Sequence, residues 1–415
     1  MSFFPCAHAG HTPWQQAARQ VAVQLSAQIS MQQLAQPPQL ALVYVSQAYA
    51  PHVQGIMSVL VAALPHVRHW VGCAVPSVLA ADTHYGAAGA LAVMLPCLAE
   101  SDYWLFSSGT PWPDAQTWSR CGQVLVHGDA SSASTSAALE SLQLHMLPAR
   151  LTGGMGQRLP HPAQWAWKTS GALHAMPASI GGAGVQLGGF SGLALAQAVG
   201  CMSISMQGYQ TQGPALQITR AEGDVVLELD GLPALRRWQS SQASISHAPA
   251  GSHFVQLSAP EAYAFEAAGP QVYGVRALDV GRSALVLDGP VRVGHWMRHC
   301  CSDETMARQE VRRACAEVWE TLTCEATTLA ATPEPADRQS PSARRGIAGA
   351  VYIRSQHRQA MQAGAHEDAE LQLIRHALGP IPLLGFTSSY EIEAGGLQQL
   401  SAQLLVFTQP MTALT

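Results

Sequence analysis

Two arginines and a histidine follow a β-prone run late in the chain, at Arg354, His357 and Arg358. Guanidinium groups bind carboxylates and phosphates through paired hydrogen bonds, so this cluster suits an amino-acid-like ligand. Tyr390 and Glu391 follow the next β-prone run, where the Glu391 carboxylate could take the amine of that ligand. The same arginines would also suit an exposed loop that binds nothing.

A second candidate is Cys73, which follows Gly72 near the end of the apolar run HWVGCAV. Ligand loops of α/β sheets lie at strand ends, so a thiol there could be a nucleophile or a haem ligand. Burial is the alternative, because free cysteines are among the most buried residues. If the chain is an enzyme, we expect Cys73 or Glu391 to be the active group, although no catalytic motif is present.

The densest set of potential metal ligands is His295, His299, Cys300 and Cys301. We interpret residues 295–299 as a strand, on which side chains four residues apart are separated by roughly 13 Å and cannot chelate one ion. No C-x-x-C pair or C-x-x-C-H haem motif occurs, although the 17 histidines leave haem as an alternative. We therefore predict no metal and no resident cofactor.

Glycine-rich stretches raise the question of nucleotide binding. They contain no G-x-G-x-x-G motif after a strand and no Gly-Lys-Ser/Thr, so they indicate no phosphate cradle. The chain also lacks the G-x-S-x-G elbow of serine hydrolases. We expect the glycines at 151–157, 179–192 and 200–213 to serve tight turns or close approach of the backbone to a ligand.

Composition narrows the class further. A chain of 415 residues exceeds the size of one hydrophobic core, which favours two domains. Its 48% hydrophobic and 12% charged residues are typical of a compact protein rather than a disordered one. A net charge of −5, with Lys168 as the only lysine, argues against nucleic acid as a partner.

The N-terminal stretch lacks the basic region and unbroken apolar segment of a secretory signal. No run approaches the roughly 18–20 apolar residues of a membrane span. The nine cysteines are scattered and odd in number, which favours reduced thiols. These features predict a cytoplasmic protein without a membrane span.

Hydrophobic periodicity predicts an α/β fold of mixed sheets flanked by helices. Strand, helix and strand within residues 40–75 suggest a parallel βαβ unit, and Pro96 suggests that the strand at 91–98 is an edge strand. The predicted helices are 14–30, 51–64, 233–239, 303–325 and 366–378. The predicted strands are 40–46, 69–75, 91–98, 123–129, a hairpin over 215–231, 272–278, 283–289, 295–299, 349–355, 381–389 and 403–409.

The predicted organisation has a helical extension over 1–37, a first domain over 38–232 and a second over 233–415. Each domain is expected to hold a mixed sheet flanked by helices. Proline and charge without apolar periodicity predict a mobile loop or linker at 332–346. A ligand pocket is expected at the domain junction or at the strand ends of the second domain.

The order of these segments resembles the FIST family, bacterial sensory domains proposed to bind small ligands and to act on signalling proteins. In the first half, the matching segments are LALVYVSQAY, WVGCAV and QGYQTQGPALQITRAEGDVVLELDGLPAL. In the second half, they are YGVRALDVGRSALVLDGPVRVGHWMR and IPLLGFTSSYEIEAGG. Through the last two, the resemblance adds Arg276, Phe386 and Ser388 to the candidate ligand-binding residues.

The sequence also departs from the family pattern. Tyr209 and Thr211 stand where the family has cysteine and proline, and Tyr390 replaces a glycine. The segment RSQHRQ keeps Arg358 but lacks the family's cysteine and glycines. The chain therefore resembles a divergent member.

The resemblance implies a two-domain bacterial sensor that binds an amino acid or a related metabolite. The sequence contains no recognisable kinase, cyclase or DNA-binding output, so the signal would pass to a separate protein of the kinase or cyclase type. Three alternatives remain: a haem-binding nitric-oxide sensor, an enzyme that uses Cys73 or Glu391, and a scaffold without a ligand.

Overall fold

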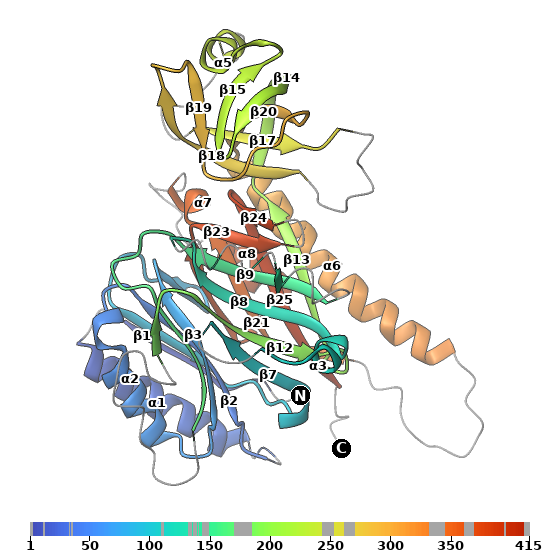
Figure 1. Ribbon diagram of the computed structural model, residues 1–415. Coiled ribbons are helices and arrows are strands. Elements are labelled where there is room, and N and C mark those ends of the chain that lie inside the picture. Colours follow the sequence, from blue (N-terminus) through green and yellow to red (C-terminus); the bar gives the residue numbers. More distant parts are fainter. Residues whose placement is uncertain are drawn as a thin grey trace.

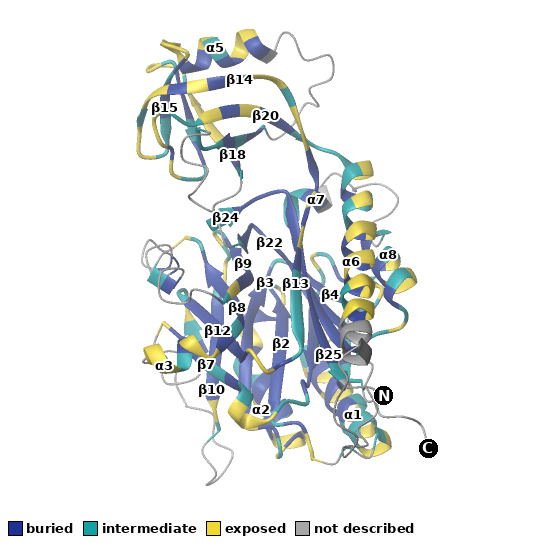
Figure 2. Cartoon of the chain, turned by 90° about the vertical axis from the view of Figure 1, so that its right-hand side faces the viewer, coloured by how far each residue is buried: buried dark blue, intermediate teal, exposed yellow. Residues whose placement is uncertain are grey.

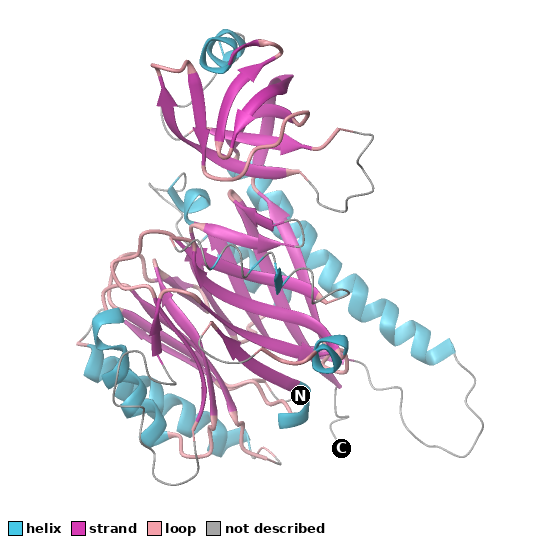
Figure 3. Cartoon of the chain, in the orientation of Figure 1, coloured by secondary structure: helices cyan, strands magenta, loops and turns pink. Residues whose placement is uncertain are grey.

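The computed structural model places the described strands in four sheets of six or seven strands each. Helices lie along the outer faces of these sheets (Figure 3). The fold is mixed α/β, which confirms the predicted class. No helix in the described part of the chain is long and apolar enough to cross a membrane. The described residues are 3–10, 13–32, 34, 36–108, 112–131, 135, 139, 141–142, 149–169, 185–242, 253–260, 270–331, 345–360, 369–393 and 396–410.

The first sheet contains the predicted βαβ unit. Strands β2 (Leu40–Ser46) and β3 (His69–Val75) are parallel, and the short helix η1 (Ala50–His52) and helix α2 (Val53–Ala63) connect them. Its strands, in spatial order, are β1 (Cys6–Gly10), β6 (Ala90–Met94), β2 (Leu40–Ser46), β3 (His69–Val75), β10 (Ala163–Lys168) and β11 (Val185–Leu187). Helices α1 (Trp14–Gln32), η1 (Ala50–His52) and α2 (Val53–Ala63) belong to the same layer.

The second and third sheets complete the body of the molecule. The second has the order β24 (Gly396–Gln398), β23 (Tyr390–Glu393), β9 (Arg150–Gly156), β8 (Cys121–Asp129), β12 (Phe190–Ala196) and β7 (Tyr103–Ser107). The third has the order β13 (Cys201–Gln207), β25 (Ser401–Pro410), β21 (Arg345–Ser355), β22 (Leu383–Ser388), β4 (Val78–Ala80) and β5 (Thr83–His84). The accompanying helices are η2 (Glu100–Asp102), α3 (Ala115–Ser119), α6 (Glu304–Ala331), α7 (Gln356–Ala360) and α8 (Ala369–Leu378).

The fourth sheet stands apart from the body, as Figure 1 shows. We call the segment 209–302, which contains this sheet and helix α5 (Ala234–Gln242), the upper unit. Its strands are β14 (Tyr209–Glu222), β20 (Trp296–Ser302), β17 (Phe254–Ser258), β18 (Gln271–Asp279), β19 (Ala284–Leu287), β15 (Val225–Leu229) and β16 (Leu232–Pro233). The predicted hairpin around Gly223 is formed by β14 and β15.

One apolar core joins the three sheets of the body. Tyr44 and Val71 of the first sheet pack with Leu125 of the second and with Ile353 and Phe386 of the third. The strands of the body are accordingly buried over most of their length (Figure 2). Helices α6 and α8 cover the opposite face of the third sheet. The body therefore has a layered core that no single half of the chain forms alone.

The division of the strands among sheets does not follow the predicted boundary between 38–232 and 233–415. The second sheet combines β7, β8, β9 and β12 with β23 and β24, and the third combines β4, β5 and β13 with β21, β22 and β25. Helix α5, which we expected at the domain junction, lies within the upper unit and packs on β15. Its Trp238 is part of the apolar core of that unit. Local periodicity carries no information on such long-range pairing, so the sequence could not reveal it.

Most predicted helices and strands are present, with small differences in their ends. Strand β6 is not an edge strand, because it ends before Pro96 and pairs with β1 on one side and β2 on the other. The predicted loop at 332–346 lies largely outside the described residues, and its last residues already belong to β21.

The glycine run at 151–157 forms strand β9 rather than a turn. A Cβ atom on Gly153 would lie 2.0 Å from the carbonyl oxygen of Val126 in the neighbouring strand. The glycines of this run therefore let strands approach closely, in place of the predicted approach to a ligand.

This close approach makes Gly153→Ala strongly destabilising. We expect a loss of about 2–3 kcal/mol in the free energy of unfolding, since the added methyl group must displace backbone. Chemical denaturation measures it. Gly281→Ala is the matched control, because a Cβ there meets nothing closer than the Asp279 carboxylate at 3.5 Å. Equal stability of the two variants would contradict this packing.

Candidate functional site

The predicted arginine cluster lies at the carboxyl ends of two parallel strands. Strand β21 ends at Ser355 beside Ser388 of β22, and helix α7 follows β21 directly. This geometry brings Arg354 and Arg358 to one edge of the third sheet. Both are buried, with 0% and 2% exposure. The cluster is therefore not the exposed loop that we considered.

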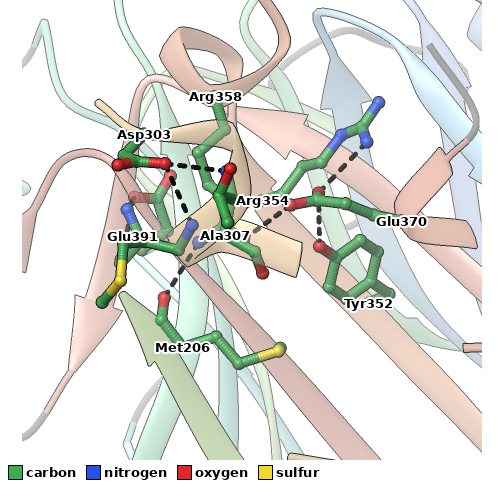
Figure 4. A network of polar contacts seen from close by, with 11 residues as sticks. Met206, Asp303, Ala307, Tyr352, Arg354, Arg358, Glu370 and Glu391 are labelled. Atoms are coloured by element: carbon green, nitrogen blue, oxygen red, sulfur yellow. Dashed lines mark hydrogen bonds and ion pairs between the residues drawn. The ribbon is translucent and has the colours of Figure 1, made fainter. Parts of the chain in front are cut away.

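A single carboxylate from helix α8 forms ion pairs with both arginines (Figure 4). Arg358 donates from Nη2 to Oε1 of Glu370 at 2.6 Å, and Arg354 donates from Nη1 to Oε2 at 3.3 Å. The Tyr352 hydroxyl donates to Oε2 at 2.7 Å. Arg358 also donates to the carbonyl oxygen of Met206 at 3.2 Å, which ties α7 to β13. Both guanidinium groups are thus engaged inside the protein.

The electrostatics of Glu370 agree with this arrangement. Burial alone would raise its pKa, but the charges of Arg358 and Arg354 and their hydrogen bonds outweigh burial and hold the pKa at about 2. Sequence reasoning missed Glu370. The available signal was its place on helix α8, where it shares the buried face with Leu371, Ile374 and Leu378. A charge on an apolar helix face indicates a buried partner.

Glu391 is also fully buried, and its carboxyl group is held by two serines. Ser388 Oγ lies 2.7 Å from Oε1, and the Oγ and backbone N of Ser401 lie 3.0 and 3.3 Å from Oε2. Burial raises the pKa of Glu391 to about 8, although these hydrogen bonds act in the opposite direction. Because Glu391 is fully buried, its carboxyl group is not accessible from the surface for the predicted contact with a ligand amine.

Three other predicted residues are buried or half-buried. Cys73 is buried between the sheets of the body, where burial raises the pKa of its thiol well above the usual value. Phe386 packs edge-on against Tyr44, with ring centroids 4.7 Å apart. His357 is half-buried and packs against Phe254 of the upper unit, with ring centroids 5.1 Å apart.

The remaining predicted residues meet at the junction between the body and the upper unit. Tyr390 is buried at the start of β23, and Arg276 is exposed on β18 in an ion pair with Asp224. Burial and the charge of Asp288 raise the pKa of Tyr390 to about 12, while a hydrogen bond with Gln157 and the charges of Arg276 and Arg158 oppose the rise.

Asp288 and Arg158 are junction residues that the sequence did not reveal. Asp288 follows β19 in the upper unit, and burial raises its pKa against the charges of Arg276 and Arg158 and a hydrogen bond from Gln399. Arg158 follows β9 in the body, has a positive φ of 53°, and its backbone N donates to Ser131 Oγ at 2.6 Å. A cation of the body and an anion of the upper unit therefore interact across the junction. Arg158 lies in no recognisable motif, and nothing in the family-like segment at 273–298 singles out Asp288.

The histidines and cysteines near His299 do not form a metal site. His299 lies in strand β20, as predicted, against Trp238 and His253. Within the described residues, no three His, Cys, Asp or Glu side chains are grouped so that they could hold a metal ion.

The buried ion pair leads to a prediction for Glu370→Gln. We expect a loss of about 3–5 kcal/mol at pH 7, because two buried guanidinium groups lose their counterion. The native pKa lies below the ordinary value of 4.5, so this contribution is complete above that value and is lost as the pH falls toward about 2. Denaturation at several pH values measures it. Glu317→Gln, which removes an exposed pair with Arg313, should change stability by less than about 1 kcal/mol.

Comparison with known proteins bears on the first half of the chain. A search of curated proteins returned no match. Residues 39–232 match the family model of the FIST N domain, over almost the range of the predicted first domain. FIST domains are generally sensory domains of signal transduction proteins and are not an enzyme family. The match does not extend to the second half, where the FIST assignment stays a prediction. This chain therefore contains a region, residues 39–232, that matches the FIST N domain.

Proposed function

We propose that this protein is a sensor that binds an amino acid or a related zwitterion at the junction between the body and the upper unit. The observation that supports the proposal most is the exposed guanidinium of Arg158. In the part of the chain that the structure describes, it has no carboxylate partner, although it lies within the electrostatic reach of Asp288.

The two groups are complementary to a free amino acid. Arg158 supplies a planar fork of donors for the ligand carboxylate. Asp288 supplies an acceptor for the ammonium group. The hydrogen-bonded pair of Tyr390 and Gln157 flanks them from the body. Arg354 and Arg358 serve this site indirectly, since their ion pair with Glu370 fixes the strand ends that border the junction.

The junction is small enough for a ligand to change it. The chain passes between the body and the upper unit at Gly208 and again at Asp303, whose backbone N donates to the Gly208 carbonyl at 3.0 Å. Its apolar contact is a small cluster in which Leu400 of the body packs with Tyr209, Phe254, Val272 and Cys300 of the upper unit.

A ligand that contacts Arg158 and Asp288 together binds one arrangement of the two parts more tightly than others. It therefore shifts the population toward that arrangement, which a separate signalling protein of the kinase or cyclase type would detect. The alternative of an enzyme that uses Cys73 or Glu391 has less support, because both groups are buried and the Glu391 carboxyl group is hydrogen-bonded to Ser388.

Binding measurements with single variants test the site. Calorimetry with a panel of amino acids should identify a ligand, and Arg158→Gln should weaken its binding about 10- to 100-fold, as expected for a lost charged hydrogen bond. Arg220→Gln is the control, since Arg220 is exposed in the upper unit and pairs with Glu228 instead. No binding to any panel member, or equal affinity of the two variants, would overturn the proposed site.

A second binding experiment tests the proposed contact between Asp288 and the ammonium group of the ligand. Replacing the ligand by its 2-hydroxy analogue, which keeps the carboxylate and loses the amine, should weaken binding to the natural protein but not to Asp288→Asn. If both proteins discriminate equally between the two compounds, Asp288 does not bind the amine. An absorption spectrum of the purified protein separates the haem alternative, because a Soret band would support a gas sensor in place of this proposal.

A further inference from the structure

The carboxyl group of Glu391 lies where four strands meet. It belongs to β23, pairs with Gly154 of β9, and contacts Ser388 at the end of β22 and Ser401 at the start of β25. It is fully buried. An ionised carboxylate in such a place is costly unless cations or several donors compensate it.

The number of hydroxyl hydrogens around Glu391 indicates whether its carboxyl group is protonated or ionised. Ser388 Oγ lies 2.7 Å from Oε1 of Glu391 and 3.2 Å from the carbonyl oxygen of Arg354. A serine hydroxyl carries one hydrogen, so it cannot donate to both oxygens. Both contacts are hydrogen bonds if the Glu391 carboxyl group is protonated. Its O–H then forms a hydrogen bond to Ser388 Oγ, and the Ser388 hydroxyl donates to the Arg354 carbonyl. Oε2 then accepts from Ser401.

None of the ion pairs among the described residues includes Glu391. On β23, the neighbouring acid Glu393 is half-buried, and its charge disfavours ionisation of Glu391. From α7 and β21, Arg358 and Arg354 are the nearby cations; both form ion pairs with Glu370, and Arg358 attracts an ionised Glu391 without forming an ion pair with it. Strand β22 contributes only the Ser388 hydroxyl. The pKa of about 8 for Glu391 agrees with a neutral acid at neutral pH.

Glu391 is connected to the junction through Ser401. The two preceding residues, Gln399 and Leu400, form a turn that we call the junction turn. The backbone N of Gln399 donates to the Val272 carbonyl at 3.1 Å, and its Oε1 accepts from the backbone N of Gly274 at 2.6 Å. The Leu400 carbonyl accepts from Gly208 N at 3.1 Å.

The junction turn also stores conformational strain. Leu400 has a φ of 62°, a value that residues other than glycine rarely adopt, and it is fully buried. Such a conformation persists only where surrounding contacts impose it. The bonds from Ser401 to Glu391 are among those contacts, so a change at the carboxyl group acts directly on the turn.

We propose that Glu391 is a proton-binding switch for the junction, neutral when the junction turn holds the upper unit and ionised when the turn is released. After loss of the proton, the single hydrogen of Ser388 can serve only Glu391 or the Arg354 carbonyl, so one of these two hydrogen bonds is lost and a buried charge remains. The carboxylate gains water if the turn opens. Opening therefore releases one proton, and rising pH favours the open arrangement by mass action.

Proton linkage gives the direction in which pH changes the stability of the closed arrangement. The pKa of Glu391 is about 8 in the closed arrangement and lies nearer the ordinary 4.5 where the carboxyl group meets water. Between these values the open form binds fewer protons, so the closed form loses stability as the pH rises. The dependence ends above a pH of about 8, once both forms are ionised.

Amide hydrogen exchange of the full-length protein tests the switch without any ligand. After correction for intrinsic rates, protection of the amides in 396–403 should fall at least about tenfold between about pH 6 and pH 9. Glu391→Gln should abolish this fall, because its amide donates to Ser388 as the neutral acid does. Glu317→Gln, an exposed acid on α6, should keep the natural response. Unchanged pH dependence in Glu391→Gln, or none in the natural protein, would overturn the proposal.

Infrared spectroscopy is the second measurement if Glu391→Gln does not fold. The natural protein should show a protonated-carboxyl band near neutral pH that disappears by about pH 9. Ser388→Ala keeps the acid and removes its acceptor, so it should shift that band. Absence of the band, or a band that Ser388→Ala leaves unchanged, would count against Glu391. Neither measurement involves the amino acid, so their failure leaves the proposed ligand site to its own tests.

Discussion

The carboxylate of Glu370 is the contact on which the architecture around the junction depends. It joins the arginine at the end of β21 to the arginine of α7, while Arg358 also reaches the backbone carbonyls of Met206 in β13 and Ala307 in α6. A buried pair of this kind adds little stability compared with an apolar substitute, but it is costly to break. Its consequence is geometric: two strands and three helices meet at one fixed edge, from which the upper unit projects.

Local elements could be predicted from the sequence because apolar spacing is a short-range property. The periodicity at residues 14–30 and the continuous run at 40–46 correspond closely to α1 and β2. The assembly of those elements could not be predicted. Strand β4, early in the chain, pairs with β22, which is some three hundred residues later, and nothing within either strand encodes that partner. The sheets therefore cross the boundary that composition and motifs suggested.

The candidate site shows the same division. Residue types at strand ends directed attention to Arg354, Arg358 and Glu391, and the family resemblance added Ser388. The structure places these four residues close together. Their roles could not be deduced, because burial and partners decide whether a guanidinium binds a ligand or an internal carboxylate. Arg158 lies outside any motif, and nothing in the family-like segment around Asp288 singles that residue out. The two become a complementary pair only through the docking of the upper unit on the body.

These constraints divide the protein into a rigid part and an adjustable part. The body has an extensive apolar core and the buried ion pairs of Glu370 with two arginines, whereas the junction relies on a small cluster around Leu400 and a few hydrogen bonds of the turn that contains it. A ligand can shift an equilibrium only by its difference in affinity for the two states, commonly a few kcal/mol. A junction of modest strength can respond to that energy, and the rigid edge beside it confines the proposed response to the junction turn and the upper unit that the turn holds.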